Sequence, residues 1–211
     1  MDFLPASISD YAEAHTSPES ELLKILNRET HLKTLQPRML SGHLQGRLLS
    51  FISKLQRPRR ILEIGTFTGY AALCLAEGLS DDGILYTIEA NDELQPMIKN
   101  YFNQSPQAHQ LRLIIGNALE IIPTLDEFFD IVFIDAGKRD YPAFFDLVID
   151  KVESGGIIIA DNILWSGKVT LDKKDMDTQI IDTFNKKIRA DARIECILLP
   201  IRDGLMMMRK I

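Results

Sequence analysis

The sequence predicts an α/β protein with a mostly parallel β-sheet, and two observations carry this prediction. From Arg60 onward, short apolar runs alternate with segments of helical periodicity, a pattern typical of parallel strands joined by right-handed crossovers. The chain has 211 residues, 45% of them hydrophobic and 26% charged, enough for one domain with a sizeable core. We therefore expect a single domain over residues 1–211, with an N-terminal helical cap at 1–55 and an α/β core at 56–211.

The first 55 residues show helical patterns and no strand signal. Leucine and isoleucine are frequent over residues 20–27. A second set recurs at the spacing of one helix face and consists of Leu44, Leu48, Leu49 and Ile52. These two segments are expected to supply the helices of the cap.

Strands and helices are expected to alternate in the core. The candidate strands are 61–64, 84–89, 111–115, 131–135 and 156–161, and the candidate helices are 70–79, 93–104, 120–125 and 142–152. A last helix at 176–190 precedes two further strands at 194–199 and 205–209. Only residues 200–204 separate these two strands, so an antiparallel hairpin is expected.

Oxygen-bearing side chains stand at the ends of two predicted strands. Asp135 closes the run 131–135, and Asp161 with Asn162 follows the run that starts at 156. Ligands of open α/β sheets bind beyond the carboxyl ends of the strands, so these residues are expected in one crevice. Such oxygens suit Mg²⁺, Mn²⁺ or Ca²⁺, which could orient two adjacent hydroxyls and lower their pKa. The alternative is that each acid only caps the helix that follows.

Two other side chains near these acids have candidate roles. Lys138 could act as general base if burial and a metal ion lower its pKa, or it could be a solvated loop lysine. Trp165 is the sole tryptophan, and it could form a wall for an aromatic substrate or serve as a packing residue.

A glycine loop and an acid suggest a nucleoside-binding half of the site. Gly65 and Gly69 lie between the first strand and its helix, in a G-x-x-x-G spacing that differs from the dinucleotide-binding spacing. Glu89 ends the second strand, where an acid can accept hydrogen bonds from both ribose hydroxyls. Residues 116–118 follow the third strand and would face the adenine. A tight turn and a solvated glutamate are the simpler alternatives.

The overall charge and the remaining residue types narrow the class of protein. The formal net charge is −6 and no long basic tract is present, so nucleic acid and anionic membranes are not the expected partners. The histidines have no ligand spacing, and Cys74 and Cys196 are expected to be buried thiols. Residues 1–5 lack the features of a secretory signal and no segment could span a bilayer, so we expect a reduced, cytoplasmic protein.

The motifs occur together in an order that resembles a known family. They are Glu63-x-Gly65-Thr66-x-x-Gly69-Tyr70, Glu89, Gly116-x-Ala118, Asp135-Ala136-x-Lys138-x-x-Tyr141, Asp161-Asn162-x-Leu164-Trp165 and Leu199-Pro200-x-x-Asp203-Gly204. From about residue 39 to residue 211 the chain resembles the cation-dependent S-adenosylmethionine (SAM) O-methyltransferases, the group of caffeoyl-CoA and catechol O-methyltransferases.

This resemblance implies a fold, a cofactor and a set of site residues. It implies a Rossmann-like seven-stranded sheet with an antiparallel last strand and helices on both faces, in an enzyme that is commonly a homodimer. SAM would be bound by Met39, Ser41, Glu63, Gly65, Thr66, Gly69, Tyr70, Glu89, Ala90, Asn117, Ala118 and Asp135. A divalent cation would be held by Asp135, Asp161 and Asn162, Lys138 would be the base, and Lys138 and Trp165 would contact the substrate.

Two positions depart from the pattern of the family. Gly137 replaces the second Asp of the usual Asp-Ala-Asp-Lys, an acid that normally helps to hold the charged end of the cofactor. Asn117 stands where many relatives carry an Asp that faces the adenine, and an amide can both donate and accept there.

The expected activity is methyl transfer from SAM to one hydroxyl of a catechol-like small molecule. An alternative keeps the chemistry but places it on a hydroxylated uridine of tRNA. The acidic net charge disfavours it, whereas five C-terminal lysines support it, namely Lys168, Lys173, Lys174, Lys186 and Lys187. A second alternative is a non-catalytic SAM-binding module, for which Gly137 is the only support.

Overall fold

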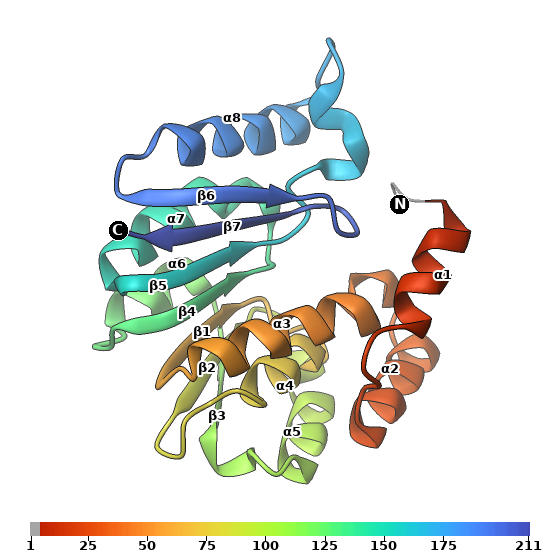
Figure 1. Cartoon of the computed structure of the whole chain (residues 1–211). Coiled ribbons are helices and arrows are strands. Elements are labelled where there is room, and N and C mark those ends of the chain that lie inside the picture. The colour runs from red at the N-terminus through yellow and green to blue at the C-terminus, as the bar shows by residue number, and fades with distance from the viewer. Residues whose placement is uncertain (1–4) are drawn as a thin grey trace.

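A seven-stranded sheet forms the centre of the computed structural model, which describes residues 5–211 (Figure 1). The strand order is β3-β2-β1-β4-β5-β7-β6, and only β7 runs antiparallel to its neighbours. The strands are β1 (Arg60–Ile64), β2 (Ile84–Glu89), β3 (Leu111–Ile115), β4 (Phe129–Ile134), β5 (Val152–Ala160), β6 (Ile194–Leu199) and β7 (Leu205–Lys210). The predicted parallel sheet, the terminal hairpin and the antiparallel last strand are confirmed.

Helices cover both faces of this sheet (Figure 1). They are α1 (Ala6–Ala14), α2 (Glu21–Lys33), α3 (Gly42–Gln56), α4 (Tyr70–Ala76), α5 (Gln95–Gln104), α6 (Ala118–Ile121), α7 (Tyr141–Val148) and α8 (Met176–Ala190). Short 3-10 turns lie at Pro37–Met39, Asp92–Leu94, Ala108–Gln110, Ile122–Thr124, Lys138–Asp140, Ile149–Lys151 and Trp165–Thr170. Among residues 5–211, no helix is long and apolar enough to cross a bilayer.

The two faces of the sheet carry separate apolar cores. Helices α6, α7 and α8 pack on one face, where Phe145 and Phe184 are completely buried. Helices α2 to α5 pack on the other face, where Leu26 of α2 and Leu49 of α3 are completely buried. Because α2 and α3 contribute to this core, they are packed into the α/β unit. The division into a cap at 1–55 and a core at 56–211, within one domain, stays a prediction, and residues 1–4 lie outside the described part.

Several element boundaries differ from those expected, and local chemistry explains the differences. Helix α4 ends at Ala76, three residues early, and Gly78 follows at a point where a Cβ would lie 2.2 Å from the backbone of Ser53. Helix α5 starts at Gln95 with a proline at its beginning, and Asn117 caps α6 by accepting a hydrogen bond from Leu119 N at 3.0 Å. The helix expected at 142–152 ends at Val148.

A 3-10 turn over Ile149–Lys151 follows that helix, and strand β5 takes up its last expected residue, Val152. It begins at Val152 because this residue pairs with Phe129 at the start of β4. Both β4 and β5 therefore start earlier than predicted, and they stop at Ile134 and Ala160. The first acid of each motif, Asp135 or Asp161, thus stands just outside its strand.

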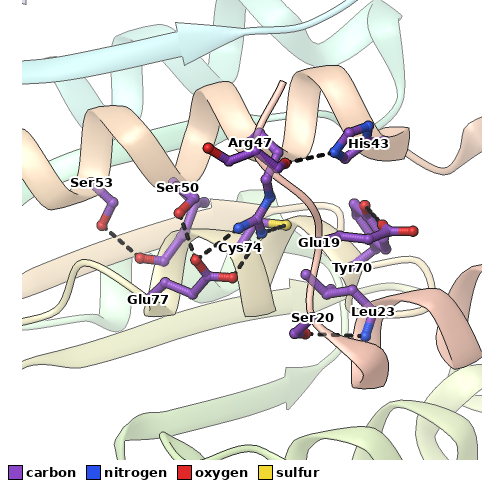
Figure 2. Close-up of polar contacts among 12 residues, drawn as sticks. Glu19, Ser20, Leu23, His43, Arg47, Ser50, Ser53, Tyr70, Cys74 and Glu77 are labelled. Atoms are coloured by element: carbon purple, nitrogen blue, oxygen red, sulfur yellow. Dashed lines mark hydrogen bonds and ion pairs between the residues drawn. The ribbon is translucent and has the colours of Figure 1, made fainter. Parts of the chain in front are cut away.

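A partly buried charge cluster fastens α3 to α4 (Figure 2). The guanidinium of Arg47 donates to both carboxylate oxygens of Glu77, at 3.0 and 2.7 Å. Ser50 and Lys54 donate to Glu77 Oε2, each at 2.7 Å. Burial raises the pKa of Glu77, but hydrogen bonds from Arg47, Lys54 and Ser50 outweigh it and lower that pKa to about 2.

The two cysteines differ in burial. Cys74 lies beside Arg47 with its sulfur 3.4 Å from Nη2, and burial raises the pKa of its thiol to about 12 (Figure 2). It is the buried thiol that the sequence predicts. Cys196 is only half-buried, since it lies on the edge strand β6, so the same prediction is wrong for this residue.

Replacing Glu77 tests the cluster. Glu77→Gln leaves the Arg47 guanidinium, only 12% exposed, without a counter-charge. We expect a loss of about 2–3 kcal/mol in the free energy of unfolding at neutral pH, measured by urea titration. The folded-state pKa is depressed, so the loss should be complete above 4.5 and should vanish as the pH falls toward 2. Glu21→Gln is the control, because its pair with Lys24 is exposed; an equal loss there would contradict the argument.

Candidate active site

One cavity of about 740 Å³ opens at the carboxyl ends of the strands, where the order reverses between β2-β1 and β4-β5. Eleven of the predicted site residues line it: Met39, Gly65, Glu89, Ala90, Asn117, Ala118, Asp135, Lys138, Asp161, Asn162 and Trp165. The structure therefore brings the nucleoside half and the metal half together. A volume of this size is typical of sites for small ligands.

The glycine loop after β1 reaches the end of β4. Gly65 has φ +97°, and a Cβ on it would lie 2.2 Å from the carbonyl oxygen of Asp135. In the next strand, the Glu89 carboxylate accepts from Phe67 N at 2.7 Å and from Asn91 N at 2.8 Å. These two bonds fix the orientation of Glu89 at the cavity wall, and each oxygen keeps a further lone pair for a ligand.

Five predicted cofactor residues lie outside the main cavity. Ser41, Thr66 and Tyr70 line a narrow void of about 10 Å³ next to it, together with Met39, Gly65 and Asp135. Gly69 lines neither space; it precedes α4 with φ +94°, and a Cβ there would lie 2.7 Å from the ring of Phe102. Its role in the structure is a close approach of the backbone.

Glu63 is the fifth of these residues and is completely buried. Its Oε2 accepts from the Thr87 hydroxyl, which lies 2.5 Å from the hydroxyl of Thr66, while Oε1 has no hydrogen-bond partner within the described part of the chain. Burial raises the pKa of Glu63 well above its ordinary value, although the Thr87 bond lowers it. Glu63 thus contacts the glycine loop through the hydroxyls of Thr87 and Thr66, and these hydrogen bonds support the loop.

The oxygen donors expected to bind a metal lie close to one another. Asp161 is 2% exposed; its Oδ1 accepts from Asn162 N at 2.6 Å and its Oδ2 from Gln45 Nε2 at 2.7 Å. Burial and the charge of Asp135 raise the pKa of Asp161 to about 6. A buried carboxylate that is destabilised by a neighbouring carboxylate favours a bound cation.

The third donor fits the same interpretation. Asn162 adopts φ +58°, an uncommon conformation for a residue other than glycine, and its side-chain amide makes no hydrogen bond to any residue of 5–211. Within these residues no three His, Cys, Asp or Glu side chains gather as a metal site. The donor set is therefore two carboxylates and one amide, which suits a hard divalent cation and leaves positions open for oxygens of a substrate.

Lys138 is held by two neighbours and is not a solvated loop lysine. Its Nζ donates to Asp135 Oδ1 and to the Tyr141 hydroxyl, each at 2.8 Å, and its side chain is 16% exposed. Burial lowers the pKa of Lys138, but the charge of Asp135 and the contact with Tyr141 outweigh burial and raise it above the ordinary value. Asp135 stabilises the ammonium form, so the lowered pKa expected from burial together with a metal ion stays a prediction.

Trp165 and Gly137 complete the wall on this side. Trp165 lines the cavity and also packs against the core of α6 to α8, so both of its predicted roles are compatible with its position. Gly137 lines the cavity too, and a Cβ there would find its nearest neighbour at 3.7 Å, in Asp140. The Asp that the family usually carries would therefore have room at this position.

The polar residues at the cavity that the sequence did not predict include two arginines and a glutamine. Arg38 and Arg202 line it, and Gln45 of α3 contacts Asp161 from behind. For Gln45 a signal exists, because it lies four residues before Leu49 and seven before Ile52 on the buried face of the helix. A completely buried glutamine must find hydrogen-bond partners. No local pattern marks either arginine.

Comparison with known sequences agrees with this geometry. A family model described as O-methyltransferase matches residues 13–211. A caffeoyl-CoA O-methyltransferase from Stellaria longipes is 29% identical over 205 residues, 92% of this chain and 85% of that protein. Caffeoyl-CoA O-methyltransferase 1 from Nicotiana tabacum is 32% identical over 206 residues, 92% of this chain and 86% of that protein.

Solved structures show the same fold. The SAH-bound methyltransferase PaMTH1 from Podospora anserina superposes with a TM-score of 0.90 at 26% identity, covering 100% of this chain and 99% of that one. The O-methyltransferase TomG from Streptomyces achromogenes, in complex with SAM, gives 0.87 at 30% identity, with 97% and 96% covered. An O-methyltransferase from Bacillus cereus, in complex with SAH, gives 0.89 at 27% identity, with 97% of each chain covered.

The fold and the glycine loop define a Rossmann-like methyltransferase that uses SAM. More narrowly, the chain belongs to the O-methyltransferase family, within the group that includes the caffeoyl-CoA enzymes. The resemblance inferred from its motifs is confirmed.

The raised pKa of Glu63 can be tested by Glu63→Gln. Burial raises the pKa of Glu63 in the folded protein, so above the ordinary value of 4.5 the folded protein holds this proton more tightly than the unfolded chain does. The wild type therefore loses stability relative to the variant as the pH rises from 4.5 toward the folded-state pKa. Urea unfolding between about pH 5 and pH 8 should show a growing difference in favour of the variant. The exposed Glu153→Gln serves as control; a difference that does not change with pH would show that Glu63 is ionised when folded.

The close approach of Gly65 to the carbonyl oxygen of Asp135 can be tested by Gly65→Ala. Gly65→Ala combines an unfavourable φ of +97° with a collision at Asp135 O, so the loop must move away from the cavity. We expect at least roughly tenfold weaker SAM binding by calorimetry, together with a lower melting temperature. Gly155→Ala separates strain from collision, since φ is +83° there and the nearest atom lies at 3.8 Å. Equal effects of both variants on stability and on SAM binding would contradict the argument.

Proposed function

We propose that this SAM-dependent O-methyltransferase requires a divalent cation and methylates one hydroxyl of a catechol-like small molecule. The observation that carries the proposal is the pair Asp135 and Asp161, two neighbouring carboxylates in the same cavity as the glycine loop. The glycine half would bind the methyl donor and the carboxylate half would bind the acceptor. The methyl group would then pass between them inside one enclosed space.

The donor half has groups suited to each part of SAM. Glu89 would accept hydrogen bonds from the ribose hydroxyls, since its carboxylate is already oriented by Phe67 N and Asn91 N. Asn117 and Ala118 would border the adenine, and Gly65 allows the backbone to approach the sulfonium end. Met39, Ser41, Thr66 and Tyr70 lie around the adjoining narrow void, near the expected place of the methionine part.

The acceptor half would hold the cation on Asp135, Asp161 and Asn162. When bound, such an ion orients two adjacent hydroxyls and lowers their pKa. Lys138 Nζ lies within the same group of residues, where it can bind the reacting oxygen and hold a proton. It can accept a proton only where the charge of Asp135 is offset, because that charge keeps the ammonium protonated.

The transfer itself is a displacement at carbon. A bond forms between the acceptor oxygen and the methyl carbon, and the bond from that carbon to the sulfonium sulfur breaks. The oxygen would lose its proton to Lys138 Nζ only where the charge of Asp135 is offset and the lysine is a neutral amine, and the sulfur keeps the electron pair. Alignment of the two substrates would supply the main rate acceleration. Trp165, which lines the cavity, would contact the aromatic ring of the acceptor.

The alternatives have less support. Four of the five lysines that favoured tRNA are ion-paired: Lys168 with Asp175, Lys174 and Lys186 with Asp182, and Lys187 with Asp146. They therefore offer less free positive charge to phosphates. A module without catalysis is disfavoured by the retained Lys138 and its contacts. The homodimer and the cytoplasmic location stay predictions.

The proposal is tested with purified protein, SAM, Mg²⁺ and a panel of catechols. Methylated product should form and should disappear in excess chelator. Asp161→Ala should reduce metal-dependent turnover at least about a hundredfold, while SAM binding by calorimetry changes little, because Asp161 serves the acceptor half. Asp172→Ala, on an exposed loop, is the control. Full activity in chelator would refute the metal requirement, and a panel without any product would refute the catechol acceptor.

A further inference from the structure

We infer that the preferred acceptor carries a carboxylate as well as its adjacent hydroxyls, and that Arg202, oriented by Gln45, binds this carboxylate. The inference rests on the proposed function and specifies its substrate class. It assigns roles to two residues that no sequence motif singled out.

Gln45 links the metal side of the cavity to Arg202. It is completely buried on α3, where Nε2 donates to Asp161 Oδ2 at 2.7 Å and Oε1 accepts from Arg202 Nη1 at 3.4 Å. Only one orientation of the amide satisfies both neighbours, since a carboxylate can only accept and a guanidinium can only donate. Gln45 therefore fixes the position of Arg202 relative to Asp161.

Arg202 is held by neutral oxygens alone. Besides Gln45 it donates to the carbonyl oxygens of Ser41 and Arg38, the latter at 3.3 Å. Within the described range 5–211 it forms no salt bridge, and Nε and one Nη2 hydrogen have no partner. Nε and Nη2 share one edge of the guanidinium, an edge that suits a carboxylate.

The backbone of Arg202 supports a functional role for its side chain. Arg202 has φ +51°, a conformation that costs energy for any residue with a Cβ. It is the third residue of the β6–β7 connection, between the strand ends Leu199 and Leu205. Glycine would adopt this conformation without strain, so the local turn gives no reason for an arginine.

The charges of the cavity make this arginine necessary for an anionic acceptor. Five acidic residues line the cavity and would repel an anion, namely Glu89, Asp135, Asp140, Asp161 and Asp203. Lys138 is paired with Asp135 at 2.8 Å, and Arg38 is exposed. Arg202 is thus the partly buried cation on the described wall that has no acidic partner. Two hydrogen bonds through the Gln45 amide join Arg202 Nη1 to Asp161 Oδ2, so these two atoms lie on the order of 8 Å apart at most. One substituted aromatic ring can span that distance.

The test compares 3,4-dihydroxybenzoate with its methyl ester, which has the same ring and hydroxyls but no charge. In the wild type, kcat/KM should favour the acid at least about tenfold. Arg202→Gly should remove this preference by lowering kcat/KM for the acid about tenfold or more, with the ester changed by less than about threefold. Glycine fits φ +51° without strain, which offsets part of the loss of three hydrogen bonds, so the variant should stay folded with a modestly lower melting temperature. Arg202→Gln should lose the preference for the acid in the same way as Arg202→Gly.

Two further variants complete the design. Arg28→Gln removes the same charge from an exposed position on α2 that lines no part of the cavity, and it should keep the full preference for the acid. Gln45→Leu removes the link, so the ratio of acid to ester should fall although Arg202 is still present. Calorimetric binding of acid and ester in the presence of SAH gives the same comparison without turnover.

Several outcomes would overturn the inference. Equal kcat/KM for the acid and the ester in the wild type would be one such outcome. Another would be an Arg202→Gly variant in which kcat/KM falls equally for both compounds, because Arg202 would then only tether the loop to Ser41 and Arg38. A strong preference for a catechol thioester of coenzyme A over the free acid would show that phosphate is the anion recognised. If product forms from the ester alone, methyl transfer stands and the carboxylate is wrong. If neither compound reacts or binds, the proposed acceptor class fails as well.

Discussion

The contact between Gly65 and the backbone of Asp135 is the constraint on which the site depends. It places the loop after β1 directly against the end of β4, with no space for a side chain between them. The register of β1 and β4 fixes this contact, since Ile64 pairs with Ile134 and Asp135 N donates to Ile64 O at 2.9 Å. Methyl donor and acceptor can therefore share one cavity because two central parallel strands end at the same level.

Because these strands end side by side, several carboxylates come together at the edge of the sheet, where they have little contact with solvent. Glu63, Asp135 and Asp161 lie near one another, and burial with mutual repulsion raises the pKa of Glu63 and Asp161. Such an arrangement does not stabilise the fold by itself, and it is typical of binding sites, where a ligand supplies the missing charge. The compensation within the chain comes from Lys138, from the amide of Gln45 and from the threonines beneath the loop.

The sequence predicted the fold and the acids well, because both depend on local patterns. Apolar runs that end in Asp135 and Asp161 identify strand ends, and strand ends of a parallel sheet meet at one edge. Gln45 and Arg202 are 157 positions apart, and their contact depends on how α3 packs against the last hairpin. The direction of the pKa shift of Lys138 also depends on three-dimensional placement, since burial and Asp135 act in opposite directions.

Gly137 is a position where the charge of the cavity can change without a change of fold. Its φ is −58°, which every amino acid adopts, and it faces open space at the cavity wall. A single nucleotide substitution converts the glycine codons GGU and GGC into aspartate codons. One such substitution would add a negative charge to the cavity wall without repacking the core, so the charge of the site is separable from the fold that carries it.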